Sequence, residues 1–377
     1  MAKEILFFSV GDSNDISLWS NVPYLFAKTL EEKGIKVIRI NIGPNKIISR
    51  FYNSVLCRTF KLFYPNHVHN YVCTGIMHRI NNIKIRKAVL KHKKADCCIF
   101  TCFDYYNKYN NIPTLLFGDW THNVLIHDRL NREKYYIERR FCKQQENAIE
   151  NADWVISMFP ECANSMKSHN PDANIIHLGL NVVNNLSQSE YTKEEILCLK
   201  KNSVSILFIG RKHYIEGAKK LVEAFRILQK KNHELELNII GLKKDDFDKL
   251  PEKVNCYGFL HKENHDENLL YYKLMSTAKV FVNPTPMWGG YSSTIEAMFY
   301  YTPIVVSRYK DFTWEFGEKI NFGKYNEEFS SLNLADDISS VIYNDKYIDT
   351  CIEAHEKVKN HTWENYINKI LSLINLK

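Results

Sequence analysis

The sequence predicts an α/β protein with two Rossmann-like domains, each built on a parallel sheet. Three observations lead to this fold class. The chain has 377 residues, which is enough for two domains of ordinary size. Short β-branched runs alternate with longer amphipathic stretches, as they do in strand–helix units. This series occurs twice, before and after a polar stretch at residues 184–203.

We therefore expect an N-terminal domain over 1–183, a linker over 184–203 and a C-terminal domain over 204–377. The strands expected in the first domain are 4–10, 36–41, 97–101, 114–117, 154–157 and 174–177, with helices at 22–33 and 129–152. The strands expected in the second domain are 204–209, 236–240, 254–257, 280–283 and 304–306, with helices at 216–231, 267–277, 293–300 and a last one at 363–376.

Composition narrows the class of protein. Hydrophobic residues make up 45% and charged residues 25% of the chain, as in an ordinary globular protein. No apolar run reaches the roughly 18 residues of a membrane-spanning helix. The ten cysteines are scattered, without the paired spacing of a zinc site. We expect reduced thiols, no metal, and a cytoplasmic protein.

Residues 46–94 form a basic stretch that contributes much of the net charge of +7 and contains no Asp or Glu. Aromatic and aliphatic residues interleave with the cations, and this composition suits an anionic membrane surface or a lipid-linked acceptor. A merely solvated basic face is the main alternative. A nucleic-acid backbone would also suit the cations, but it is the least favoured partner.

The first candidate for ligand binding is the turn Gly210-Arg211, which follows the expected strand 204–209. A glycine at the end of a strand lets the backbone turn tightly next to a ligand. Arg211 then offers a planar, permanently charged donor to a phosphate. The turn is a weak signal by itself.

The second candidate is a strand, a glycine-containing loop and a helix start between residues 280 and 300. Unpaired backbone N–H groups at a helix start form an anion site, which suits a diphosphate. Glu296, one turn into the helix, is placed to accept hydrogen bonds from ribose hydroxyls. The hydroxyls of Ser292, Ser293 and Thr294 are expected to assist the anion, and Gly290 and Tyr291 are further candidates for donor binding.

These segments together resemble the donor-binding half of the retaining GT-B glycosyltransferases of the bacterial polysaccharide type (glycosyl transferases group 1). The likeness is strong over about 100 residues and looser elsewhere. Three features carry it in order: the Gly-Arg turn, the Glu-Ala-Met segment and the Thr-Pro-x-Val-Val strand, here Gly210-Arg211, Glu296-Ala297-Met298 and Thr302-Pro303-Ile304-Val305-Val306. The loop Gly258-Phe259-Leu260 lies where the family contacts the base, and Lys212 follows the Gly-Arg turn.

The resemblance implies a GT-B fold whose last helix packs back on the N-terminal domain. It implies a hexosyltransferase that moves sugar from a nucleotide-sugar donor to a glycan or lipid-linked acceptor, with retention and without a metal or other cofactor. The enzyme would be cytoplasmic, with peripheral association at the inner membrane face. In polysaccharide biosynthesis such an acceptor would be membrane-linked.

Two positions depart from the family pattern. Trp288 stands where the family has a glutamate, and Glu216 stands where it has a phosphate-binding lysine. Lys212 or Lys219 could compensate for the missing cation. The departures leave two alternatives: a donor with a single phosphate, such as a CMP-sugar, or a catalytically degenerate module that binds a sugar nucleotide or a membrane surface. The basic stretch leaves a further alternative, a glycosyltransferase that modifies nucleic acid.

The N-terminal domain supplies further candidates. Asp119 and His122 follow an expected strand at its carboxyl end, where ligands of α/β proteins bind, and would orient the sugar or acceptor. A turn cap and a structural histidine are their alternative roles. Trp19 and Ser20 lie in a segment similar to the Trp-Ser-Gly-x-Pro loop of one subgroup and are expected on the acceptor side. Trp19 could also simply pack.

Overall fold

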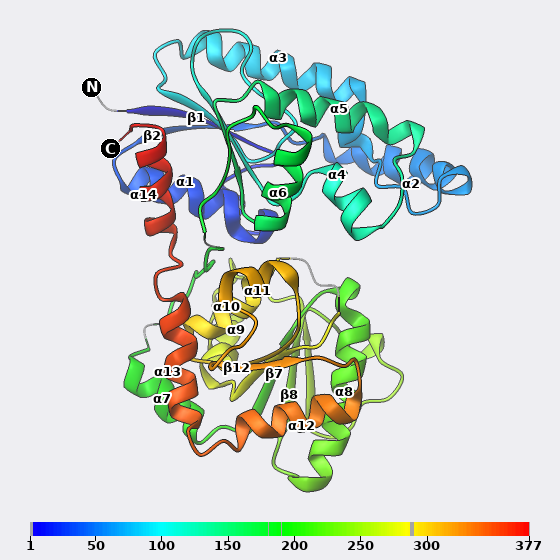
Figure 1. The fold of residues 1–377 in the computed structure, drawn as a ribbon, viewed down its shortest axis with the longest axis vertical. Helices are drawn as coiled ribbons and strands as arrows, with labels where there is room; N and C mark the ends of the chain where they lie inside the picture. The colour runs from blue at the N-terminus through cyan, green and yellow to red at the C-terminus, as the bar shows by residue number, and fades with distance from the viewer. Residues whose placement is uncertain (1–2, 180, 190, 287–289, 377) are drawn as a thin grey trace. The chain divides into compact units, whose positions relative to one another are not determined.

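The computed structural model describes residues 3–179, 181–189, 191–286 and 290–376 (Figure 1). The chain divides into two compact units, one comprising Met1–Leu180 and Trp363–Lys377 and the other Asn181–Thr362. Residues 184–203, for which we expected a linker, fall within the second unit. Among the described residues no helix is both long and apolar enough to span a bilayer.

The first unit is built on six parallel strands in the order β2-β1-β3-β4-β5-β6. The inner strands are fully buried, as expected where helices cover both faces of a parallel sheet. The strands are β1 Glu4–Ser9, β2 Lys36–Asn41, β3 Cys97–Phe100, β4 Thr114–Gly118, β5 Trp154–Ser157 and β6 Ile175–His177.

Helices pack against this sheet, with α3 and α5 together on one side of it (Figure 1). The helices are α1 Val22–Glu32, α2 Lys46–Phe63, α3 Gly75–Lys91, α4 His122–Val124, α5 Tyr136–Glu150, α6 Pro160–His169 and α14 Trp363–Leu373. Short 3₁₀ or π segments lie at Leu18–Asn21, Tyr71–Cys73 and Leu125–Arg129.

An aromatic cluster holds α14 in the first unit. Phe26 of α1 is fully buried, and its ring centroid lies 5.3 Å from Phe7, 5.2 Å from Phe117 and 5.6 Å from Trp363. Buried aromatic side chains contribute large apolar areas, and tilted ring pairs add to that contribution. The helix α14 therefore belongs to the apolar core that β1, β4 and α1 form in the first unit.

The second unit repeats the architecture with six parallel strands in the order β12-β11-β10-β7-β8-β9. Its strands are β7 Ser205–Ile209, β8 Glu236–Ile240, β9 Val254–Gly258, β10 Val280–Asn283, β11 Ile304–Ser307 and β12 Gly323–Asn326. Its helices are α7 Lys193–Lys201, α8 Ile215–Lys231, α9 His265–Thr277, α10 Ser292–Phe299, α11 Lys310–Phe316, α12 Ser331–Ile342 and α13 Tyr347–Val358, with 3₁₀ turns at Lys212–Tyr214 and Lys244–Asp246.

The helix expected at 129–152 is too long at its start. In the structure α5 begins at Tyr136, because the preceding residues fold back to cap it. Glu138 is 1% exposed and accepts from the backbone N–H of Tyr135 at 2.9 Å and from the Arg132 guanidinium at 2.7 Å. Asn131 has a φ of 46°, which ends any helical path from Arg129.

Several elements were not expected from the sequence, among them β12, α2, α3, α6, α11, α12 and α13. The strand β12 lacks a β-branched run, although it pairs with β11 along its whole length. The helices α2 and α3 occupy the basic stretch 46–94, where frequent Lys and Arg residues make the helical spacing of the apolar residues hard to recognise. The buried residues of α3 are Met77, Asn81, Ile85 and Val89, which recur at helical spacing.

We predict that Trp363→Ala destabilises the first unit by about 3–5 kcal/mol, because it empties a buried aromatic site. Hydrogen exchange of the β1 amides should accelerate accordingly. Trp314→Ala is the matched control, because this tryptophan is 55% exposed. Unchanged exchange in Trp363→Ala would show that α14 does not support the core.

Candidate functional site

The strand order of the second unit has a switch point at the carboxyl ends of β7 and β10, and we call the region outside these strand ends the switch-point crevice. These two strands are neighbours, but the chain continues from β7 to β8 on one side and from β10 to β11 on the other. At such a switch point the following helices leave on opposite faces, and ligands bind outside the strand ends. The loops that follow β7 and β10 carry the candidates Gly210, Arg211 and Gly290 to Thr294.

Glycines allow the backbone at this crevice to pack closely. A Cβ on Gly210 would lie 2.8 Å from the Phe208 ring. A Cβ on Gly217, in the first turn of α8, would lie 2.2 Å from Oγ1 of Thr285, which follows β10. The two loops of the switch point therefore touch at Gly217, which the sequence interpretation did not single out.

Arg211 lies directly after β7 with an exposed side chain. Its guanidinium carbon lies 4.7 Å from the ring centroid of Phe259, which is a cation–π contact that holds the arginine without neutralising it. Lys212 differs, because its side chain is 85% exposed and pairs with Asp246 at 3.3 Å. Gly258 has a φ of 67°, and Leu260 is buried.

The start of α10 offers backbone N–H groups. No side chain caps the helix, so its first donors have no side-chain acceptor among the described residues. Ser292 and Ser293 are half-buried, and Gly290 is exposed. Tyr291 and Thr294 are fully buried.

Of the two departures from the family pattern, one is described. Glu216 lies in the first turn of α8 with its side chain 72% exposed and pairs with Lys219 at 3.3 Å. Trp288 lies outside the described residues.

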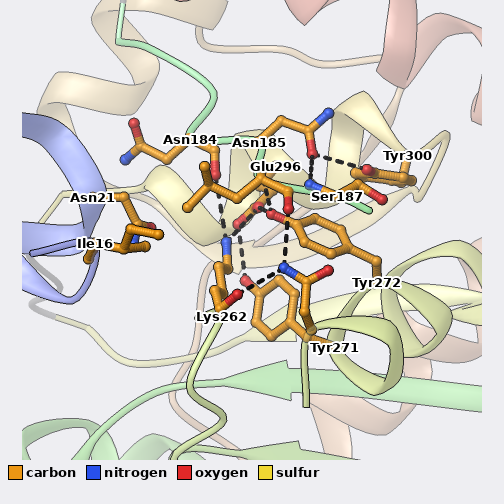
Figure 2. A network of polar contacts seen from close by, with 12 residues as sticks. Ile16, Asn21, Asn184, Asn185, Ser187, Lys262, Tyr271, Tyr272, Glu296 and Tyr300 are labelled. Carbon is orange, nitrogen blue, oxygen red and sulfur yellow. Dashed lines mark hydrogen bonds and ion pairs between the residues drawn. The ribbon is translucent and has the colours of Figure 1, made fainter. Parts of the chain in front are cut away.

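Glu296 is the centre of a buried polar network (Figure 2). Its Oε1 accepts from Lys262 Nζ at 2.7 Å and from the Tyr272 hydroxyl at 3.0 Å, and its Oε2 accepts from the Tyr271 hydroxyl at 2.8 Å. The side chain is 4% exposed. A carboxylate has about four acceptor positions, so three are filled by the protein itself.

Lys262 holds this carboxylate from the loop between β9 and α9. Its Nζ also lies 4.2 Å from the ring centroid of Tyr271 and 5.0 Å from that of Tyr272. Burial beside Glu296 raises the pKa of both tyrosines, so their hydroxyls stay protonated and donate. Sequence reasoning missed Lys262, because nothing in its local pattern indicates a partner on α10.

A second buried carboxyl, Glu315, joins distant parts of the second unit. Its Oε2 accepts from the hydroxyl of Tyr291, the residue before α10. Its Oε1 accepts from the backbone N–H of Asn181 at 3.2 Å and lies 3.4 Å from Nδ1 of His361. Burial raises the pKa of Glu315 to about 7. The start of α10 is thus tied to both ends of the unit.

We predict that Glu315→Gln flattens the pH dependence of the second unit's stability. The ordinary pKa of a glutamate, 4.5, rises to about 7 on folding, so the folded chain binds the proton more tightly. Stability is therefore lost as the pH rises between these values, and the variant should lose less of it. Melting curves from acid to neutral pH would test this, with Glu234→Gln, whose side chain is 78% exposed, as control. Parallel curves for wild type and Glu315→Gln would contradict it.

The first unit contains a pocket of about 380 Å³ at the carboxyl ends of β1, β3 and β4. It brings together three of the sequence candidates, Trp19, Asp119 and His122. Asp119 accepts from Trp19 Nε1 at 3.3 Å and from the backbone N–H of Trp120 at 2.8 Å. The pocket thus joins aromatic walls to a buried carboxyl group.

Burial shifts the pKa values of the titratable groups in this pocket. It raises the pKa of Asp119, and it lowers that of His122 to about 4, so His122 is neutral near neutral pH. The His122 ring packs edge-on against Phe141 at 4.6 Å. A third group, Asp104, accepts from Gln145 at 2.7 Å and has its pKa raised by burial to about 6.

Sequence reasoning missed Asp104, although the signal was present. It follows β3 as Asp119 follows β4, and neighbouring parallel strands end at the same edge of the sheet. The rule that selected Asp119 therefore selects Asp104 as well.

The backbone beside this pocket is strained. Three consecutive residues other than glycine have left-handed conformations: Trp19 with a φ of 41°, Ser20 with 53° and Asn21 with 73°. Each costs about 1–3 kcal/mol, and such strain concentrates at functional sites. Trp19 lines the pocket, whereas Ser20 is exposed.

We predict that Ser20→Gly stabilises the first unit by about 1 kcal/mol, because glycine adopts a positive φ without a steric penalty. Ser20→Ala is the control and should not stabilise, since alanine keeps the Cβ. Chemical denaturation of both variants would measure the difference. Equal stability of Ser20→Gly and Ser20→Ala would show that the strain is not present in solution.

Among the described residues, no group of three or more His, Cys, Asp or Glu side chains is arranged to hold a metal ion.

Comparison with known proteins links this geometry to a family. Residues 203–319 match the family model described as glycosyl transferases group 1. This segment covers β7 to α11 and so contains the whole switch-point crevice. No curated protein matches the chain in sequence.

Solved structures resemble the chain in fold at low identity. WaaG, a glycosyltransferase involved in lipopolysaccharide biosynthesis, is 12% identical with a TM-score of 0.66, over 98% of this chain and 99% of that one. HepE of Anabaena, solved with UDP-glucose, is 13% identical with a TM-score of 0.59, over 98% and 99%. TarM of S. aureus, solved as a mutant with fondaparinux, α-GlcNAc-glycerol and UDP, is 19% identical with a TM-score of 0.55, over 78% and 59%.

The chain thus spans about 59% of the length of TarM, but nearly the full length of WaaG and HepE. Its two doubly wound units confirm the GT-B fold class predicted from the sequence. The chain has the GT-B fold, and its second unit carries the sequence pattern of the glycosyl transferases group 1.

Proposed function

We propose that this protein is a glycosyltransferase, and most specifically a hexosyltransferase. It transfers a sugar from a nucleotide-sugar donor to a glycan or lipid-linked acceptor, with retention of configuration and without a metal. The observation that carries the proposal is the switch-point crevice of the second unit, which lies wholly within the segment that matches glycosyl transferases group 1. HepE bound to UDP-glucose supports a nucleotide-sugar donor by analogy.

The crevice suits the charge that develops in this reaction. The bond between the sugar's anomeric carbon and the phosphate oxygen breaks, and the nucleoside diphosphate leaves with the electron pair. Arg211 and the N–H groups at the start of α10 are preorganised donors for that charge. The acceptor hydroxyl attacks from the leaving-group face, forms the new bond and releases its proton.

The first unit supplies polar groups for sugar hydroxyls. His122 is neutral, and the carboxyl groups of Asp104 and Asp119 have raised pKa values. In the proposed mechanism Asp119 and His122 orient the sugar or acceptor, and Trp19 forms the wall behind them. Polar groups placed in an aromatic-lined pocket give orientation and specificity.

For Glu296 the ribose-binding role expected from its position is kept, but the protein leaves it fewer free acceptor positions. Because three of its acceptor positions are filled within the protein, we propose that it binds a ribose hydroxyl through its one remaining position. Lys262 and the two tyrosines then fix the direction in which that position points.

We predict that Arg211→Ala weakens binding of nucleotide sugars by about tenfold to a hundredfold, the loss expected for a charge-assisted hydrogen bond. Thermal shift against UDP-, GDP-, ADP- and CMP-sugars would identify the base, since a ligand that binds only the folded protein raises its stability. Arg226→Ala on α8 is the matched control and should bind like wild type. Equal affinity of the Arg211 and Arg226 variants would remove the proposed donor site.

The second candidate function is a module that binds a sugar nucleotide without turning it over. Glu216 favours it, because this carboxylate in the first turn of α8 stands where the resembled enzymes have a phosphate-binding lysine. If the crevice binds a diphosphate, Glu216→Lys should tighten UDP binding several-fold, whereas Glu223→Lys later in the helix should not. Calorimetry measures binding, and sugar transfer across an acceptor panel separates the enzyme from the module.

A further inference from the structure

Helix α2 is hardly covered by the rest of the first unit. Of its 18 residues only Cys57 is buried. The neighbouring α5 buries six of 15 residues, so α2 is unusual within its own unit. In Figure 1 it reaches one end of that unit. Packing in the core of the first unit therefore does not explain the large apolar side chains of α2.

The apolar side chains of α2 face solvent as a continuous stripe. Ile47, Phe51, Val55 and Leu62 recur at spacings that place them on one side of a helix. Their exposed fractions are 80%, 67%, 47% and 79%. Large exposed apolar surfaces of this kind mark interaction sites.

Cations border this stripe without any acidic residue. Lys46, Arg50, Arg58 and Lys61 lie on α2, and no Asp or Glu occurs between Lys33 and Asp96. Among the described residues no Lys or Arg of 46–94 forms an ion pair, and the one contact of this kind in the stretch joins His92 to Glu4 at 3.1 Å. The surface around α2 therefore combines unneutralised positive charge with exposed apolar side chains.

The exposed apolar stripe and the positive charge of α2 together favour one class of partner over the others. A second copy of this face would bring cations against cations. A nucleic-acid backbone would use the charge but leave the apolar stripe in water. An anionic lipid surface takes both, because apolar side chains enter the acyl boundary while cations remain at the headgroups.

We propose that α2 lies in the headgroup region of an anionic lipid bilayer, with the Ile47–Phe51–Val55–Leu62 stripe immersed. The cations of α2 pair with lipid phosphates. Exposed apolar residues of α3, such as Ile83 at 56%, extend the same kind of surface. This association does not depend on sugar transfer, so it stands or falls separately from the proposed function.

Binding of the full chain to vesicles tests the proposal. Vesicles with equal parts of phosphatidylglycerol and phosphatidylcholine should sediment the protein, and pure phosphatidylcholine vesicles should retain much less, since each cation contributes about 1 kcal/mol near an anionic surface. Phe51→Ser with Leu62→Ser should weaken binding at least about tenfold through lost apolar area. Leu332→Ser, at a leucine that is 56% exposed on α12, should bind like wild type.

A tryptophan at position 51 reports immersion directly. Emission from Phe51→Trp should shift to the blue with anionic vesicles and should be quenched by brominated lipid. Three results would overturn the proposal: no preference for anionic vesicles, unchanged binding by the Phe51/Leu62 variant, or tighter binding to duplex DNA or RNA than to vesicles. Self-association abolished by that variant, without lipid binding, would identify a second copy instead.

Discussion

The carboxylate of Glu296 is buried, and the second unit has to neutralise it. An unpaired buried charge is so costly that breaking such a pair typically destabilises a protein by about 3–5 kcal/mol. Lys262, Tyr271 and Tyr272 provide the pairing, and they come from the loop before α9 and from α9 itself. The start of α10 is therefore fixed by the position of α9, and the proposed donor crevice inherits this rigidity.

The contacts of Glu296 also show which features of the second unit cannot be predicted from the sequence. Strands buried on both faces are largely apolar runs, so β5, β8 and β10 are predicted to the residue. The bounds of the edge strand β2 are also predicted, although it contains no buried residue. The Gly-Arg turn and the start of α10 follow from the strands. The partner of Glu296 does not, because Lys262 is 34 residues away in sequence and only the pairing of α9 with α10 brings them together.

Two features of the first unit, the helix α2 and the pocket residue Asp104, are not predicted from the sequence, for different reasons. In residues 46–94 the basic composition was noticed, but the helical spacing of α2 was not, since its apolar face points outward and no buried pattern supports it. Asp104 is not among the residues predicted from the sequence, although it lies in the segment after β3 as Asp119 lies in the segment after β4. The backbone strain of Trp19 to Asn21 has no sequence signal, because none of the three is a glycine.

The two units present opposite electrostatic characters at the ends of their strands. The second unit offers an exposed guanidinium and unpaired N–H groups, which suit a diphosphate. The pocket of the first unit offers a neutral imidazole and carboxyl groups whose ionisation burial opposes. Such groups exchange hydrogen bonds with hydroxyls, and no Lys or Arg of the described chain lines the pocket to attract a diphosphate. This difference in charge supports the proposed roles of the two units, with donor binding in the second and acceptor binding in the first.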